Sequence, residues 1–138
     1  MHDLFLIHRS DLSYSELAKL LELHRVDTVV DARSSDEPGD FSFSVLGALC
    51  SAFGFGYLRR GDRLAPAPVG DRDREALSTA VGSLAEVAKH SRVALLVDAD
   101  LEHLPPAARA HGLLLFSIAK SGVVRLYEDH LPMQEHSP

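Results

Sequence analysis

Two apolar runs that end abruptly in charged residues constrain the fold of this chain more than any other feature. The first is VDTVVDARSS, from Val26 to Ser35, and the second is RVALLVDAD, from Arg92 to Asp100. Neither run alternates apolar with polar residues, which is typical of strands buried on both faces of a parallel sheet. We therefore expect two strands whose carboxyl ends deliver polar side chains to the same edge of one sheet.

Short apolar runs alternate with helical patterns along the whole chain. The predicted strands are Leu4 to Ile7, Thr28 to Asp31, Gly56 to Arg59, Val93 to Val97 and Val123 to Tyr127. The predicted helices start at a capping box of Ser13 and Glu16, at about Ser44, at about Asp73 and at Pro105, and the last runs to near Gly122. This alternation predicts an α/β three-layer sandwich, with about five mostly parallel strands and helices on both faces. We assume the strand order 3-2-1-4-5.

The length of 138 residues suits a single domain, residues 1–138, with an ordinary hydrophobic core. The Gly/Pro-rich segment 61–70 is predicted to be a loop, and residues 130–138 are expected to form a frayed tail.

Composition excludes several classes of partner. A net charge of -6, from 14 basic and 20 acidic residues, argues against a nucleic-acid partner, because such proteins usually carry a basic excess. No apolar run approaches the length of a membrane span. The single cysteine, Cys50, indicates a reducing compartment, so we expect a cytoplasmic protein. Cys50 lies in an apolar helical pattern and is predicted to be buried and unreactive.

The carboxyl ends of the predicted strands bring four groups of polar residues to one edge. They are His8, Arg9 and Ser10; Asp31, Arg33 and Ser34; Arg59 and Arg60; and Asp98, Asp100, Glu102 and His103. In open parallel sheets ligands bind at this edge, where the strand order reverses, which for the assumed order lies between the first and fourth strands. Because arginine binds carboxylate and phosphate well, we expect a small anionic ligand there.

Arg33 has two possible roles. It can clamp an anion while Asp31 orients it, or it can form a structural ion pair with Asp31. We favour the clamp, because Arg33 follows the apolar run, where solvent or a ligand can reach it.

A metal site is a further possibility at this edge. The acidic residues after the fourth strand, together with His8, offer oxygen and imidazole ligands. Their spacing matches no dedicated metal motif, and acidic loops are commonly just solvated, so we predict no metal. No phosphate-binding loop, dinucleotide fingerprint or paired-cysteine motif is present, so no cofactor is predicted.

Four segments resemble a known family. The runs LIHRSDLSYSEL, VVDARS, FGYLRRGDR and VALLVDADLEH look like the uncharacterised bacterial proteins grouped as domain of unknown function 488, over nearly the whole chain. Members share a Gly-His-Ser turn, an Asp-Val-Arg-Ser strand end, and Cys-Ala-Glu followed by Glu-His-Cys-His-Arg. Ser10 matches the end of the first motif, Asp31, Arg33 and Ser34 match the second, and Glu102 and His103 match the start of the last.

The chain also departs from the family pattern. His8 and Arg9 stand at the glycine and histidine of the turn, and Val97 stands at the first cysteine. The second cysteine, with the histidine and arginine that follow it, is replaced by Leu104, Pro105 and Pro106. The resemblance therefore implies that any thiol or metal chemistry of the relatives is lost here.

Three functions remain open. The first is a module that binds a small anionic ligand and whose catalytic site is degenerate. The second is a hydrolase acting on an anionic substrate, with Arg33 as clamp, Asp31 or Asp98 as base, and His8 or His103 as acid or base. The third is a subunit that works through protein contacts. A concave pocket that contains Arg33 and one of these histidines would favour the hydrolase.

Overall fold

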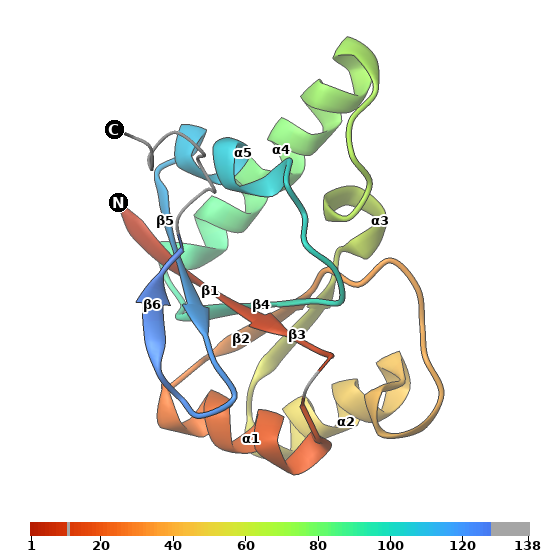
Figure 1. Ribbon diagram of the computed structural model, residues 1–138, viewed down its shortest axis with the longest axis vertical. Coiled ribbons are helices and arrows are strands. Elements are labelled where there is room, and N and C mark those ends of the chain that lie inside the picture. The colour runs from red at the N-terminus through yellow and green to blue at the C-terminus, as the bar shows by residue number, and fades with distance from the viewer. Residues whose placement is uncertain (11, 128–138) are drawn as a thin grey trace, which may run out of the picture.

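A six-stranded sheet organises the computed structural model, which describes residues 1–10 and 12–127 (Figure 1). The strands are β1 (His2–His8), β2 (Thr28–Asp31), β3 (Gly56–Arg59), β4 (Val93–Val97), β5 (Leu113–Ile118) and β6 (Val124–Leu126). The helices are α1 (Tyr14–Leu23), the 3-10 turn η1 (Gly39–Phe41), α2 (Phe43–Phe53), α3 (Gly61–Leu64), α4 (Gly70–Ala88) and α5 (Leu104–Ala110). The strand order is β3-β2-β4-β1-β5-β6, and all neighbours are parallel except β5 and β6.

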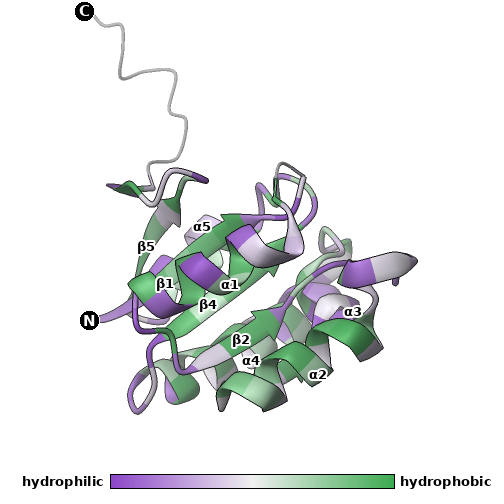
Figure 2. Cartoon of the chain, turned by 90° about the horizontal axis from the view of Figure 1, so that it is seen from below, coloured by the Kyte–Doolittle hydropathy of each residue, from purple (hydrophilic) through white to green (hydrophobic). Residues whose placement is uncertain are grey.

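The pleat of the strands divides the core into two layers. On β1, Phe5 and Ile7 pack with the buried faces of α1 and α2, whereas Leu4 and Leu6 pack with α3, α4 and α5. Figure 1 shows these two sets of helices on opposite sides of the sheet, and Figure 2 shows the apolar character of the strands between them. The predicted α/β three-layer sandwich is therefore confirmed.

The elements with the strongest local sequence patterns are present in the structure. The predicted strands 28–31, 56–59 and 93–97 coincide with β2, β3 and β4. The capping box of α1 is present: the Glu16 amide donates to Ser13 Oγ at 3.2 Å, and the Ser13 amide donates to Glu16 Oε1 at 2.8 Å. Both otherwise unpaired amides of the first turn are thereby satisfied.

The prediction of a long fourth helix, from Pro105 to near Gly122, is wrong. The helix α5 stops at Ala110, Gly112 takes a left-handed φ of 76°, and the run LLLFSI forms β5. A short continuous apolar run fits a buried helix as well as a buried strand, so its periodicity could not separate the two. The predicted last strand is also shorter than expected and becomes β6, an antiparallel strand at the edge of the sheet.

The assumed strand order 3-2-1-4-5 is wrong as well. β4 lies between β2 and β1, and β5 takes the other side of β1. In the assumed order, the connections that follow β1 and β4 would diverge and open a crevice. In the observed order, the connection from β1 to β2 passes across β4, and the connection from β4 to β5 passes across β1.

Element boundaries differ from the prediction by a few residues elsewhere. α4 begins at Gly70 instead of Asp73, and the predicted loop 61–70 contains the short helix α3. The predicted tail 130–138 lies outside the described residues. None of the helices in the described part of the chain is long and apolar enough to cross a membrane.

Candidate functional site

Asp31 and Arg33 form a buried ion pair at the end of β2. Asp31 is the last residue of the strand and shares a face with Val29, the face covered by α1 and α2. The side chains of Asp31 and Arg33 are 0% and 1% exposed, and Arg33 Nη2 lies 2.8 Å from Asp31 Oδ2. Two opposite charges are thus removed from water together, which is tolerable only when their hydrogen bonds are satisfied.

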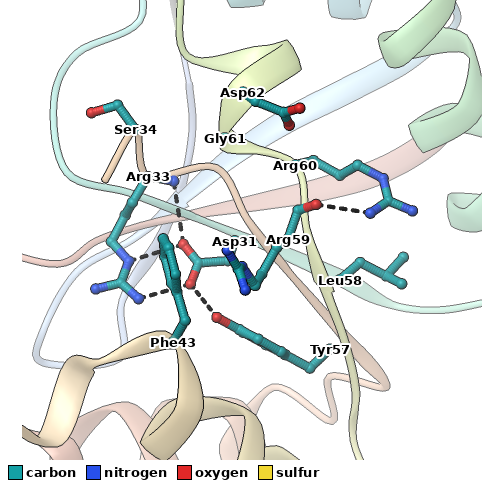
Figure 3. Close-up of a pocket in the computed structure, with 10 residues that line it drawn as sticks. All are labelled: Asp31, Arg33, Ser34, Phe43, Tyr57, Leu58, Arg59, Arg60, Gly61 and Asp62. Atoms are coloured by element: carbon teal, nitrogen blue, oxygen red, sulfur yellow. Dashed lines mark hydrogen bonds and ion pairs between the residues drawn. The ribbon is translucent and has the colours of Figure 1, made fainter. Parts of the chain in front are cut away.

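The hydrogen bonds of Asp31 are satisfied by Arg33, after β2, and by Tyr57 on β3 (Figure 3). Its carboxylate accepts from Arg33 Nε at 2.9 Å, from the Arg33 amide at 3.2 Å and from the Tyr57 hydroxyl at 2.5 Å. Burial raises the pKa of Tyr57, and its hydrogen bond to the Asp31 carboxylate raises it further. Burial opposes the charge on Arg33, but the hydrogen bonds and charge of Asp31 outweigh it and raise the Arg33 pKa. Asp31 is therefore an anchored carboxylate and Tyr57 a neutral donor.

The prediction that Arg33 is open to solvent is wrong, because its side chain is only 1% exposed. Besides its two bonds to Asp31, the guanidinium donates from Nη1 to the Phe41 carbonyl at 2.7 Å and to Glu37 Oε1 at 3.0 Å. The apolar run does end before Arg33, but the segment that follows folds back over its side chain. In this structure Arg33 takes the structural role that was the alternative to the clamp.

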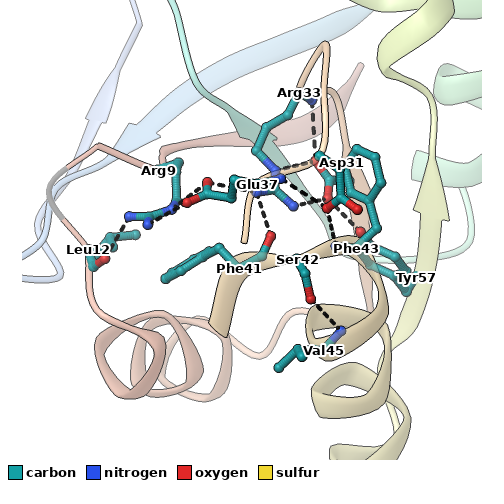
Figure 4. A network of polar contacts seen from close by, with 11 residues as sticks. Arg9, Leu12, Asp31, Arg33, Glu37, Phe41, Ser42, Phe43, Val45 and Tyr57 are labelled. Carbon is teal, nitrogen blue, oxygen red and sulfur yellow. Dashed lines mark hydrogen bonds and ion pairs between the residues drawn. The ribbon is translucent and has the colours of Figure 1, made fainter. Parts of the chain in front are cut away.

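Arg9, a second predicted site residue, meets Arg33 through Glu37 (Figure 4). Arg9 donates from Nε and Nη2 to the two carboxylate oxygens of Glu37, each at 2.9 Å. These hydrogen bonds, followed by the charges of Arg9 and Arg33, hold the pKa of Glu37 below its ordinary value. Sequence reasoning did not select Glu37, although its place four residues after Arg33 in a polar segment was a usable signal.

A cavity of about 520 Å³ lies at the carboxyl ends of β2 and β3 (Figure 3). It is lined by Asp31, Arg33, Ser34, Phe43, Tyr57, Leu58, Arg59, Arg60, Gly61 and Asp62. Gly61 closes one wall by close backbone packing, because a Cβ placed there would lie 1.7 Å from the Arg33 carbonyl oxygen. The cavity therefore joins three predicted site residues, Ser34, Arg59 and Arg60, above the buried pair.

Arg59 and Arg60 are the exposed cations of this cavity. The Arg59 guanidinium lies 4.1 Å from the centre of the Phe43 ring, and Arg60 Nη1 donates to the Arg59 carbonyl at 2.8 Å. Among the described residues, neither arginine forms an ion pair with a carboxylate. Cations stacked on a ring keep their charge and their donors available for an anion.

The remaining predicted residues lie elsewhere. His8 Nε2 lies 3.3 Å from Asp100 Oδ1 with both side chains exposed, and His103 donates from Nε2 to the Leu64 carbonyl at 2.7 Å. Neither histidine lines the cavity that contains Arg33. Asp98 and Glu102 are exposed and line neither this cavity nor the space between β1 and β4.

The expected ligand site between β1 and β4 is nearly filled. The space there measures about 20 Å³ and is lined by residues that include His8, Val97 and Asp100. This is room for about one water molecule. The connection from β1 to β2 passes across β4, and the connection from β4 to β5 passes across β1, so no crevice opens between the two strands. A second open hollow, about 470 Å³, lies instead at the ends of β1 and β5 and includes Ser10.

Cys50 is buried, as predicted, on the face of α2 that packs against the sheet. Burial raises the pKa of its thiol to about 11, and the negative charge of Asp31 acts in the same direction. The thiolate that a nucleophile needs is therefore suppressed at neutral pH.

In the part of the chain that the structure describes, no three His, Cys, Asp or Glu side chains are placed to hold a metal ion. Comparison with protein-family models, curated proteins and solved structures finds no match to this chain.

Proposed function

We propose that this protein binds a small anionic ligand in the cavity at the ends of β2 and β3. The observation that carries the proposal is the position of Arg59 and Arg60, two exposed arginines that line a cavity of about 520 Å³ and have no carboxylate partner among the described residues. Cavities that bind small molecules typically measure about 300–1,000 Å³. The ligand class is a carboxylate or phosphate, which guanidinium groups bind through paired hydrogen bonds.

Two features favour anion binding over the alternative that Arg59 and Arg60 are only solvated side chains at the end of β3. Phe43 orients the Arg59 guanidinium, which lowers the entropy lost when the side chain engages an anion. Ser34 also lines the cavity, and its hydroxyl is a neutral donor. The acidic Asp62 at the same cavity disfavours ligands that present negative charge on every side.

In this proposal the buried pair of Asp31 and Arg33 fixes the position of the residues that line the cavity. Asp31 receives hydrogen bonds from Arg33 and Tyr57, and the Asp31 carbonyl accepts from the Arg60 amide at 2.8 Å. These bonds tie the ends of β2 and β3 together, so the two arginines at the cavity are carried on a rigid edge.

The hydrolase alternative has less support. It needs Asp31 or Asp98 as base and His8 or His103 as acid or base, but neither histidine nor Asp98 lines the cavity, and Asp31 is held in its ion pair with Arg33. A binding module with a degenerate catalytic site is therefore the better proposal. We also propose membership of domain of unknown function 488, on the strand-end motifs alone, and a cytoplasmic location, on the single cysteine.

The test is a thermal-shift titration with sodium phosphate and sodium citrate, each compared with sodium chloride at equal ionic strength. We expect either anion to raise the unfolding midpoint of the parent protein, because a ligand that binds only the folded state stabilises it by mass action. The double variant Arg59→Ala/Arg60→Ala should lose this increase.

The matched control is Arg72→Ala, which removes an exposed arginine of α4 that lies outside the cavity. It should keep the response to both anions. Equal responses of the parent and the Arg59→Ala/Arg60→Ala variant would refute the proposal.

A further inference from the structure

The Glu37 carboxylate sits between two guanidinium groups, from the segments that follow β1 and β2. Arg9, after β1, contacts both of its oxygens at 2.9 Å, and Arg33, after β2, contacts Oε1 at 3.0 Å (Figure 4). Bidentate contact from one arginine and a third hydrogen bond from another is the pattern with which proteins bind free carboxylate and phosphate ligands. Here the chain itself supplies the anion.

Both arginines are held in place by contacts that do not involve Glu37. Arg9 donates from Nη1 to the Leu12 carbonyl at 3.0 Å, and its guanidinium lies 3.6 Å from the centre of the Phe41 ring. Arg33 is fixed by Asp31 and by the Phe41 carbonyl. The two cations therefore keep their geometry when Glu37 is absent, which is what preorganisation of an anion site requires.

Glu37 itself is the least fixed member of the cluster. It lies in the irregular segment between β2 and η1, and its side chain is 33% exposed, against 1% for Arg33. Its carboxylate can leave by rotation of one side chain, without breaking a helix or a strand.

Charge supports exchange with an outside anion. Asp31 balances Arg33, so removal of the Glu37 carboxylate leaves the positive charge of Arg9 unbalanced among the described residues. We infer that Arg9 and Arg33 form an oxyanion-binding site that Glu37 fills in this structure, and that an external carboxylate or phosphate occupies the site when Glu37 moves out.

Arg33 also lines the cavity of Arg59 and Arg60, but the contacts to Glu37 involve neither of those two arginines, so the inference does not rest on the proposed function. An external anion and the Glu37 carboxylate compete for the two arginines, so an anion that enters displaces Glu37. Glu37 belongs to the same connection as Ser34, which lines the cavity.

The experiment compares Glu37→Ala with the parent protein in thermal-shift titrations with sodium acetate and with sodium phosphate. Sodium chloride at equal ionic strength corrects for screening. We expect the apparent Kd for acetate, phosphate or both to be about tenfold lower in Glu37→Ala than in the parent, because the internal competitor is gone. The acetate and phosphate arms distinguish a carboxylate ligand from a phosphate ligand.

Three further variants separate site binding from a general charge effect. Glu86→Ala removes the same charge from an exposed ion pair with Lys89 and should behave like the parent. Arg9→Ala/Glu37→Ala should lose the tightened binding, whereas Arg59→Ala/Arg60→Ala/Glu37→Ala should keep it. This last result would hold even if the proposed function were wrong.

If Glu37→Ala does not fold in sodium chloride, Glu37→Gln replaces it, because the amide keeps the shape of the side chain without its charge. Tightened binding of acetate or phosphate by either variant, lost on removal of Arg9, supports the inference. Equal anion dependence of the parent, the Glu37 variant and Glu86→Ala would overturn it.

Discussion

The Tyr57 hydroxyl on β3 donates a hydrogen bond of 2.5 Å to Oδ2 of Asp31, the oxygen that also accepts from Arg33 Nη2 at 2.8 Å. One buried carboxylate oxygen therefore links an edge strand, its neighbour and the segment that follows. These contacts join β2, β3 and the segment after β2 beneath the cavity.

Arg33→Ala should lower the free energy of unfolding by about 3–5 kcal/mol in the absence of any ligand, because it leaves the buried Asp31 carboxylate without its cation. Urea denaturation at pH 7 measures the loss. The exposed Arg72→Ala should stay within about 0.5 kcal/mol of the parent. If Arg33→Ala were about as stable as the parent, Arg33 would not be stabilising Asp31. Its alternative role, the clamp for an anion, would then be favoured.

Gly61→Ala should destabilise the protein by about 1–3 kcal/mol or more, because the new Cβ would lie 1.7 Å from the Arg33 carbonyl oxygen, and backbone cannot move aside cheaply. The control is Gly47→Ala on α2, where the added Cβ has a contact of 3.4 Å with the Tyr57 ring and helix propensity improves. Equal unfolding midpoints for the two variants would contradict the close approach of the segments around Gly61 and Arg33.

Cys50 should resist thiol reagents in the native protein at pH 8, because the side chain is buried and its pKa is raised to about 11. Labelling should become rapid only in a denaturing concentration of urea. Fast labelling of the folded protein would show that the inner face of α2 is open to solvent.

The same thiol should make stability fall as the pH rises. Between its ordinary pKa of 9.0 and about 11, the unfolded thiol loses its proton while the folded one keeps it, so alkaline pH favours unfolding. The free energy of unfolding should therefore decline more steeply from pH 8.5 to pH 10.5 in the parent than in Cys50→Ala. Tyr57, whose pKa is also raised, contributes equally to both proteins. Parallel pH profiles would count against a protonated buried thiol.

Ser13→Ala should cost about 1 kcal/mol, because it removes the acceptor of the Glu16 amide at the start of α1. Ser13→Asp is the matched variant, since its carboxylate can accept the same hydrogen bond, and it should stay near the parent. Denaturation midpoints in urea decide between the two outcomes. An unchanged midpoint for Ser13→Ala would show that the cap adds nothing to stability.

Local pattern was sufficient for the central elements of the fold. The strands β2, β3 and β4 and the cap of α1 were predictable because each depends on a few neighbouring residues: continuous burial for β4, a hydroxyl and a carboxylate three residues apart for α1. The strand β5 was not, since its six residues carry no periodicity that separates strand from helix.

In the candidate site, too, some features could be predicted from the sequence and others could not. The sequence by itself determined that Arg9, Arg33 and Arg59 lie at or just after the carboxyl ends of strands, because that placement needs only the strands themselves. Only the tertiary structure decided that Arg33 is enclosed and Arg59 is open to solvent. Strand order put β3 beside β2 and brought Tyr57 to Asp31, 26 residues away, while the chain after β2 carried Glu37 to Arg9, 28 residues away. Contacts over such separations depend on register and packing, which no local pattern of residues encodes.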